Sequence, residues 1–292
     1  VDRVPASFWF HFPPEERAGH AMAQAHLRYY RAADPDFLKV MNDNGYALLG
    51  VDALRTPADW RRIRPAPLSA PPFQDQLAGL KEIVDALAGE VLLVTTLFNP
   101  FATGNDISGR MTTEHLRQDP EAVSAGLGAI AESLAGFARA CIEAGAAGIY
   151  FSAQGGERDR FTPEQFERYI MPHDLTVLRA AEAAGARFNL LHIRGPSIRL
   201  GSYAGYPAHA VNWAPQLGNL SLREGRALFR RTVVGGIDQR GSIVSGPPDA
   251  IRAEVRRALD EMGTIGFMLG AGCTVPSDIP VGNLVIARDA VA

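Results

Sequence analysis

Two short apolar runs end in residues that could carry out chemistry, although they lie far apart in the sequence. Residues 188–195 read Phe-Asn-Leu-Leu-His-Ile-Arg-Gly and place His192 and Arg194 before a turn, and residues 266–276 place Cys273 in the same position. An imidazole and a thiolate can bind a metal ion, move a proton or act as a nucleophile. Each also has an alternative interpretation without chemistry, as a hydrogen-bonded core histidine and as an inert buried cysteine.

The pattern of the whole chain predicts where these residues lie. Apolar runs bounded by turn formers predict buried strands, and we place eight of them at residues 7–12, 37–43, 91–97, 147–152, 188–195, 208–213, 233–238 and 266–273. Helical patterns separate them, at 15–33, 73–87, 120–143, 162–184, 221–229 and 247–262, with a short helix after Pro280. Residues 52–72 and 98–106 are predicted to be irregular. Alternating strands and helices imply parallel strands, and eight units favour an α/β fold with a single (β/α)₈ TIM barrel over residues 1–292.

Polar residues gather where the predicted strands end. They are His11, Asn42, Asp43, Asn99, Gln154, His192, Arg194, Asn212, Asp238 and Cys273. In such barrels the chemistry takes place at the C-terminal ends of the strands. So many polar groups would be costly in a core, because buried polar groups without partners are destabilising. We therefore predict an enzyme with its active site at this mouth, the alternative being a barrel that only binds a ligand.

Composition excludes several classes of protein. The formal net charge of −3 gives no basic surface for nucleic acid. The apolar runs are shorter than the ~20 residues of a membrane span, and no signal-peptide pattern opens the sequence. The two cysteines, Cys141 and Cys273, cannot form a disulfide framework. We expect a cytoplasmic protein that contacts neither nucleic acid nor membrane.

Short motifs along the whole chain carry a resemblance to a known family. They are Val1-Asp-Arg-Val-Pro5, Asp36-Phe-Leu-Lys-Val-Met41, Phe98-Asn-Pro-Phe101, Phe161-Thr-Pro-Glu164, Ile170-Met-Pro172, Gly235-Gly-Ile-Asp238 and Gly272-Cys-Thr-Val-Pro276 with Asp278, Pro280 and Asn283. In this order they resemble the uroporphyrinogen decarboxylase family. The resemblance implies one of two chemistries: decarboxylation of a porphyrinogen without a cofactor, or zinc-dependent methyl transfer between a corrinoid and a thiol.

The sequence departs from both branches of that family. The decarboxylases carry an Arg-Gln-Ala-Gly-Arg-Tyr run after the first strand, where this chain reads Phe10-His-Phe-Pro-Pro-Glu15 and has no arginine for substrate carboxylates. The methyltransferases carry His-x-Cys after the fifth strand and Gly-Cys after the eighth, which bind zinc. Here the first motif reads His192-Ile-Arg194, and arginine cannot bind a metal because it stays protonated. His192 and Cys273 are then the metal candidates, and a third ligand would be Asp43, Gln154 or Asp238.

The leading hypothesis is a methyltransferase- or demethylase-like enzyme that acts on a small anionic substrate. Under this hypothesis His192, Asp43 and Cys273 are catalytic. Whether zinc is bound is left open, and so is whether a corrinoid protein or a second copy of the chain is a partner. Arg194 binds the anion, unless it forms a structural ion pair with an acid such as Asp238, and the remaining strand-end residues contact the substrate. The alternative is a metal-free decarboxylase or lyase, in which Arg194 neutralises the carboxylate and Asp43 or His192 manages the proton. The third hypothesis is a non-catalytic binding barrel.

Overall fold

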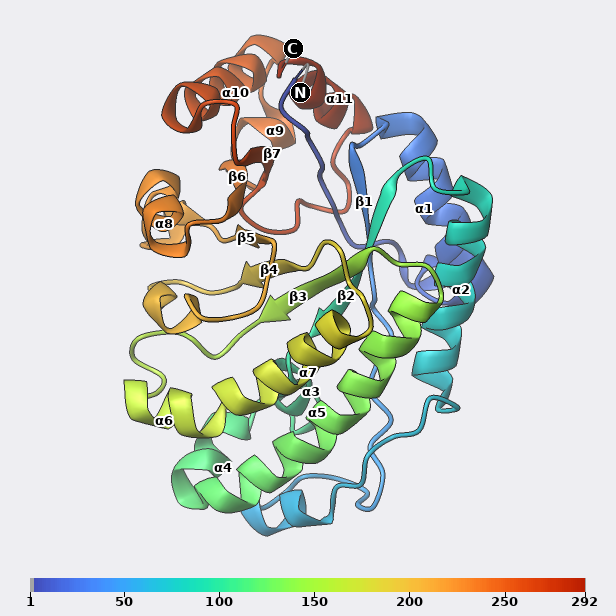
Figure 1. Cartoon of the computed structure of the whole chain (residues 1–292), viewed down its shortest axis with the longest axis vertical. Coiled ribbons are helices and arrows are strands. Elements are labelled where there is room, and N and C mark those ends of the chain that lie inside the picture. The colour runs from blue at the N-terminus through green and yellow to red at the C-terminus, as the bar shows by residue number, and fades with distance from the viewer. Residues whose placement is uncertain (1–2, 292) are drawn as a thin grey trace.

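Seven parallel strands follow one another in a single curled sheet, in the order in which they occur in the sequence (Figure 1). The structure is a computed structural model that describes residues 3–291; Val1 and Asp2, which begin the first family motif, and Ala292 lie outside the described residues. The strands are β1 (Phe37–Val40), β2 (Leu92–Phe98), β3 (Gly148–Ala153), β4 (Leu190–Ile193), β5 (Ala210–Asn212), β6 (Thr232–Ile237) and β7 (Phe267–Ala271). The predicted parallel α/β architecture is thereby confirmed.

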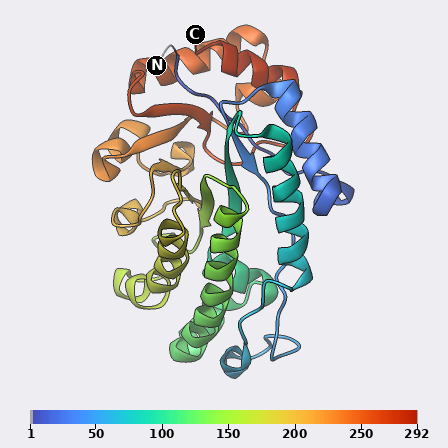
Figure 2. The ribbon, with the colours of Figure 1, turned by 45° about the vertical axis from the view of Figure 1, so that its right-hand side comes forward.

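Helices surround the outside of this sheet, and the two ends of the described chain lie close together (Figure 1). The α-helices are α1 (Gly19–Ala33), α2 (Pro71–Leu87), α3 (Pro100–Ile107), α4 (Thr112–Gln118), α5 (Pro120–Glu143), α6 (Pro163–Tyr169), α7 (Met171–Ala183), α8 (Leu222–Phe229), α9 (Ser242–Ser245), α10 (Pro248–Met262) and α11 (Val281–Asp289). Four short 3-10 helices are η1 (Pro14–Glu16), η2 (Pro57–Arg62), η3 (Leu200–Tyr203) and η4 (Pro215–Leu217). Figure 2 shows α2 and α5 running next to each other outside the strands.

The strand predicted at residues 7–12 does not form, so the sheet has seven strands and not eight. The segment bonds to both edge strands only at its start: the Ser7 amide donates to Leu269 O of β7 at 3.0 Å, and the Ser7 hydroxyl donates to Phe37 O of β1 at 2.7 Å. Beyond Ser7 other groups take its backbone carbonyls. The Tyr29 hydroxyl donates to Phe8 O, and the Val275 amide donates to Trp9 O. A ladder cannot continue where the carbonyls it needs are already bonded elsewhere.

Two further predictions are wrong in detail because of proline. The helix predicted over 162–184 is divided at Ile170 into α6 and α7, since Pro172 lacks the amide that would continue the helical hydrogen bonds. The irregular stretch predicted at 98–106 is mostly helix α3. Asn99 caps its first turn, with Oδ1 accepting from the Ala102 amide at 3.0 Å, and Pro100 occupies the first helical position.

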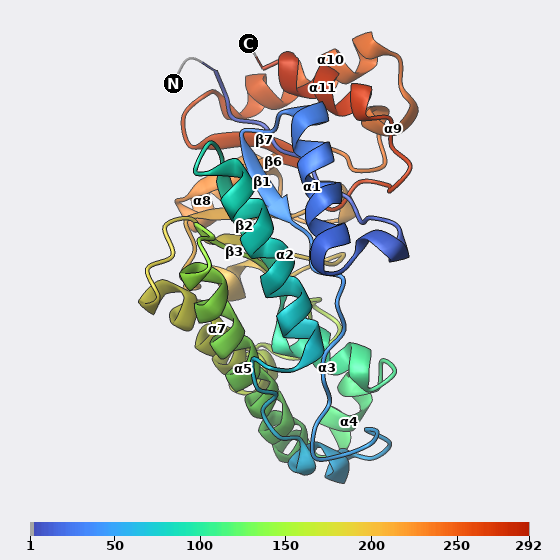
Figure 3. The ribbon, with the colours of Figure 1, turned by 90° about the vertical axis from the view of Figure 1, so that its right-hand side faces the viewer.

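The irregular stretch at 52–72 is confirmed, and one tryptophan fixes it to the helices. Trp60 of η2 is fully buried, and its indole Nε1 donates to Nδ1 of His115 at 3.0 Å. Gly104 of α3 and Gly126 of α5 leave room for the ring, since a Cβ on either would come within 3.0 Å of Trp60 atoms. Figure 3 shows this stretch beside α4 at the end of the molecule below the sheet.

Helix α5 is more apolar than the sequence analysis allowed for. Of the helices in residues 3–291, it alone has the length and the apolar composition needed to cross a membrane. In its most apolar stretch of 18 residues, 56% is buried inside the structure. It packs against α7, α3 and η2, and Phe137 and Ile130 on it are completely buried. This packing is that of a helix in the core of a globular protein.

A buried carboxyl group connects α7 to the residue that follows β2 and to the segment between η3 and β5. Asp174 is completely buried, and its two oxygens accept from Asn99 Nδ2 at 3.0 Å and from the Tyr206 hydroxyl at 2.9 Å. Burial raises the pKa of Asp174 to about 8, against the two hydrogen bonds, which act to lower it. The carboxyl is therefore mainly protonated at neutral pH.

This protonation predicts a pH-dependent stability that an amide would not have. A carboxyl whose folded pKa is raised above its ordinary value of 3.8 stabilises the fold most below that value, and the contribution is lost as the pH rises through about 8. Asp174→Asn keeps an acceptor for Asn99 and a polar partner for Tyr206. We expect wild type to lose stability relative to Asp174→Asn across this pH window in urea unfolding. A difference between the two proteins that stays constant with pH would contradict the assignment.

Candidate active site

A cavity of about 900 Å³ opens where the strands end. Its wall contains residues from the C-terminal ends of β2, β3 and β4 and from the loops that follow β1, β5, β6 and β7. Because parallel strands all end at the same edge of the sheet, side chains that are distant in the sequence meet here. Six of the predicted site residues line it: His11, Gln154, His192, Arg194, Asp238 and Cys273.

His192 and Cys273 form a pair across this cavity. His192 Nε2 lies 3.6 Å from Cys273 Sγ, and His192 Nδ1 lies 2.6 Å from Asn212 Oδ1. The Asn212 amide nitrogen donates to Val234 O and Ala271 O at 2.8 and 3.0 Å, so its oxygen must face the histidine. An oxygen acceptor at Nδ1 keeps the proton there and leaves Nε2 to exchange a proton with the thiol.

The surroundings of Cys273 favour a thiolate. Burial alone would raise the pKa of the thiol, but the nearby His192 ring, a hydrogen bond from the Thr274 backbone amide and the charge of Arg194 together lower it to about 6. Cys141 of α5 has the opposite character, because it is fully buried and burial raises the pKa of its thiol. The two cysteines should therefore differ sharply in reactivity.

Iodoacetamide should modify Cys273 at neutral pH and leave Cys141 unmodified in the folded protein. The rate at Cys273 should rise through pH 6, well below the ordinary thiol pKa of 9.0. Peptide mass spectrometry over a pH series measures both sites in the same sample. Modification of Cys273 that rises only near pH 9, or equal modification of both cysteines, would contradict the predicted thiolate.

Several arginines near the pair take part in no ion pair within the described residues. Arg110, Arg194 and Arg240 line the cavity and are exposed, and none of them forms an ion pair within residues 3–291. Arg160, by contrast, is neutralised by Glu157, at 2.8 Å between Nε and the carboxylate. Asp238 does not pair with Arg194, because its Oδ1 accepts from Gln216 Nε2 at 3.0 Å and from the Arg240 amide at 2.9 Å. Within residues 3–291 the structural ion pair considered for Arg194 does not form, and its guanidinium is available to an anion.

Two predicted residues lie in a side pocket of about 320 Å³ that shares Arg194 and Gln154 with the main cavity. Asn42 and Asp43 line this pocket. Asp43 Oδ1 is 2.7 Å from Nδ1 of His11, and Arg17 lies 3.8 Å from its other oxygen. Asp43 is thus already bound by two basic groups, which leaves His192 and Cys273 as the better placed pair for proton transfer.

Two other predicted residues line neither cavity. Asn99 and Asn212 are completely buried, and each holds another group in place: Asn99 caps α3 and bonds Asp174, and Asn212 orients His192. Substrate binding by either side chain has no geometric support. Like His192, they follow apolar strand residues in the sequence, but other residues of the same chain cover them.

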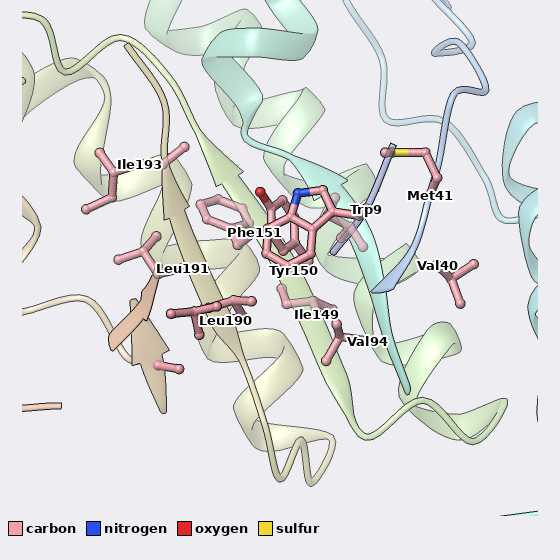
Figure 4. Close-up of a cluster of buried hydrophobic side chains, with 14 of the residues drawn as sticks. Trp9, Val40, Met41, Val94, Ile149, Tyr150, Phe151, Leu190, Leu191 and Ile193 are labelled. Atoms are coloured by element: carbon pink, nitrogen blue, oxygen red, sulfur yellow. The ribbon is translucent and has the colours of Figure 1, made fainter. Parts of the chain in front are cut away.

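Lys39 was not among the predicted site residues, although it is the most unusual group in the cavity. It lies inside β1 with 4% of its surface exposed, and Nζ donates to Met41 Sδ at 3.0 Å. Its Nζ lies 4.3 Å from the centroid of the Tyr150 ring and 5.9 Å from that of the Trp9 ring. Figure 4 shows these two rings packed against each other, with Met41 nearby. Burial lowers the pKa of Lys39 to about 7, and Asp43 and Cys273 oppose this only in part. The available signal was a lysine in the middle of the apolar run Phe37-Leu-Lys-Val40.

The donor atoms present do not fit a catalytic zinc ion. Such sites use three protein ligands, and the part of the chain that the structure describes contains no group of three His, Cys, Asp or Glu side chains placed to hold a metal. His192 and Cys273 supply two donors. Arg194 and Lys39 line the same cavity, and each of them repels a cation when charged.

Curated relatives of two kinds match part of this chain. A uroporphyrinogen decarboxylase from Syntrophotalea carbinolica is 28% identical over 179 residues, which cover 60% of this chain and 49% of that protein. The methylcobamide:CoM methyltransferase MtaA from Methanosarcina barkeri is 29% identical over 165 residues, 54% of this chain and 46% of that protein. The chain thus spans about half the length of these relatives.

The fold is shared along nearly the whole chain. A solved methyltransferase from Methanosarcina mazei superposes with a TM-score of 0.76 at 18% identity, covering 99% of this chain and 94% of that chain. A B12-independent methionine synthase from Shewanella gives 0.65 at 12% identity. The sequence model of the family described as uroporphyrinogen decarboxylase (URO-D) matches residues 19–292. The resemblance in the sequence motifs is confirmed, and the chain belongs to the uroporphyrinogen decarboxylase family.

Proposed function

We propose that this protein is a metal-independent carboxy-lyase that removes CO₂ from a small anionic substrate in the main cavity. One observation carries the proposal: the same cavity holds an unpaired guanidinium, Arg194, and an acid–base pair, His192 and Cys273, with 3.6 Å between Nε2 and Sγ. The relatives named above include a decarboxylase and a methyltransferase. Both decarboxylation and methyl transfer therefore occur among proteins similar to this chain.

Arg194 accounts for recognition of an anion. A guanidinium binds a carboxylate through two parallel hydrogen bonds, and its charge does not depend on pH. The cavity is large enough for a small acid with several carbons. Because residues 10–15 lack the arginines of the porphyrinogen decarboxylases, we place the substrate among smaller acids with fewer carboxylates.

The His192–Cys273 pair accounts for the proton. Loss of CO₂ leaves an electron pair on carbon, and the net reaction then takes up one proton for each CO₂ released. The thiol of Cys273, or the imidazolium that forms when the thiol gives its proton to Nε2, can deliver that proton at the cavity wall. A donor with a pKa near the working pH serves this step well, because it both gives and regains a proton readily.

The test is CO₂ release from a panel of small carboxylic acids, measured with and without a strong zinc chelator, beside metal analysis of protein purified without added zinc. Release that the chelator leaves unchanged, in protein with far less than one zinc per chain, supports the proposal. Turnover that follows the zinc content would overturn it, and no turnover of any acid would do the same.

Methyl transfer is the second candidate, and the reactive thiol of Cys273 favours it. A thiolate can take a methyl group from a donor, so that the donor–methyl bond breaks and a sulfur–carbon bond forms. This version of the methyltransferase- or demethylase-like hypothesis needs no zinc, and a corrinoid protein is one methyl donor to test. A mass increase of one methyl group on Cys273 after incubation with a donor, without CO₂ release, would favour it over the lyase.

A further inference from the structure

We propose that Lys39 is a covalent catalyst that forms an imine with the ketone of a β-oxo carboxylic acid, which makes β-oxo acids the substrate class of this site. The inference rests on the proposed carboxy-lyase function and adds what that function lacks, a group that accepts the electron pair left when CO₂ departs. An iminium nitrogen accepts such a pair readily, and lysine amines form this group with carbonyl substrates.

The distribution of lysine in the chain singles out this residue. Of the 29 basic residues counted as Lys and Arg, the only lysines are Lys39 and Lys81. Lys81 lies on the surface of α2, with 69% of its side chain exposed and an ion pair to Asp85. Where the chain needs only a positive charge it uses arginine, which cannot act as a nucleophile because it stays protonated. The buried strand position at the cavity holds the one other lysine.

Within residues 3–291 the amine of Lys39 contacts aromatic rings and a thioether and takes part in no ion pair. Its one hydrogen-bond acceptor in residues 3–291 is the thioether of Met41, which is a weak acceptor. It forms no ion pair with a carboxylate in the described chain. A buried ammonium without a carboxylate partner is costly, and burial lowers the pKa of Lys39 to about 7, so a substantial fraction of the amine is neutral at neutral pH.

Neighbouring groups are placed for the remaining steps. Tyr150 packs on both reactive groups, because Lys39 Nζ lies 4.3 Å from its ring centroid and the His192 ring stacks on it at 5.3 Å. An acid bound to Arg194 therefore has the amine and the His192–Cys273 pair within the same cavity. The pair can protonate the departing hydroxyl during imine formation and later the carbon from which CO₂ leaves.

The steps balance without a cofactor. The Lys39 amine adds to the ketone carbon, and loss of one water gives the iminium. The bond between the α-carbon and the carboxylate breaks, CO₂ leaves, and the electron pair moves into the iminium to give an enamine. One proton adds to the enamine carbon, and water then hydrolyses the iminium to release the ketone and free Lys39.

The experiment traps this intermediate with borohydride in the full-length chain. Acetoacetate, oxaloacetate and acetonedicarboxylate are each incubated with the protein and reduced, and peptides are analysed by mass spectrometry. We expect a reduced adduct on Lys39 in wild type and in the matched control Lys81→Arg. In Lys39→Arg, which keeps a long basic side chain but cannot form an imine, the adduct should fall to background and CO₂ release should fall by roughly 10²-fold or more.

A second probe does not depend on turnover. Acetylacetone condenses with a neutral amine to an enaminone that absorbs in the near ultraviolet, so it should label Lys39 and spare Lys81, which is exposed and ion-paired. Labelling of Lys81 alone, or of neither lysine, would overturn the inference even if Lys39→Arg folds poorly.

The outcomes separate the inference from the function on which it rests. CO₂ release from an acid that is insensitive to chelator, with no adduct on Lys39 and full activity in Lys39→Arg, removes the covalent step and leaves the carboxy-lyase standing. An adduct on Lys39 without CO₂ release from any acid keeps the imine chemistry and removes the carboxy-lyase.

Discussion

Substitution of His192 by glutamine is expected to lower kcat for CO₂ release by about 10³-fold, the scale of losing a group that transfers the proton. KM should change little, because Arg194 and not His192 holds the carboxylate. Glutamine keeps a similar size and a polar end near Asn212, so a loss of this size would not reflect a cavity in the core. The matched control is His20→Gln, since His20 has 78% of its side chain exposed and contacts Glu82 outside the site.

The same variant has a readout that a structural role would not move. His192 is the main group that lowers the pKa of the Cys273 thiol, so in His192→Gln the alkylation rate of Cys273 should rise only at higher pH, toward the ordinary value of 9.0. A variant that loses activity while Cys273 still reacts as in wild type would argue against the pair as the proton-transfer unit.

Substitution of Arg194 by methionine is expected to raise KM for the acid by roughly 10- to 100-fold, since a hydrogen bond to a charged group contributes about 1.5–3 kcal/mol. Arg194→Lys should raise KM by a smaller factor but should still bind the acid more weakly than wild type, because a point charge replaces the bidentate guanidinium. In both variants kcat at saturating substrate should stay within a few-fold of wild type.

Arg61→Lys is the control for this series. Arg61 pairs with Asp119 on the surface, where 52% of its side chain is exposed, and an exposed pair of this kind contributes little. Equal KM values in wild type, Arg194→Lys and Arg194→Met would mean that the anion binds elsewhere in the cavity, with Arg110 and Arg240 as the next candidates.

Some features of the protein follow from the sequence alone. The alternation of apolar runs and helical patterns determined a parallel sheet, and a parallel sheet brings every strand end to one edge. That is why His192 and Cys273, 81 residues apart, could be placed in one site, and they lie 3.6 Å apart. The family motifs were recognisable for a similar reason, since they are strand ends, helix starts and turns whose residue types are locally constrained.

Other features were decided only by the tertiary structure, because they depend on what a residue meets and not on its neighbours in sequence. Residues 7–12 have the composition of a strand, but Tyr29 and Val275 take the carbonyls that a ladder needs. Asn99 and Asn212 follow the same pattern as His192, yet burial turns them into residues that hold others in place.

The environment of Lys39 depends most strongly on the tertiary structure. The sequence places a lysine in an apolar strand but does not tell which groups surround its amine. Only the curled sheet shows that Tyr150, Trp9 and Met41 contact it and that no carboxylate in residues 3–291 forms an ion pair with it. The pKa of a buried amine is set by the balance between lost hydration and nearby charge, and both terms are properties of the folded chain.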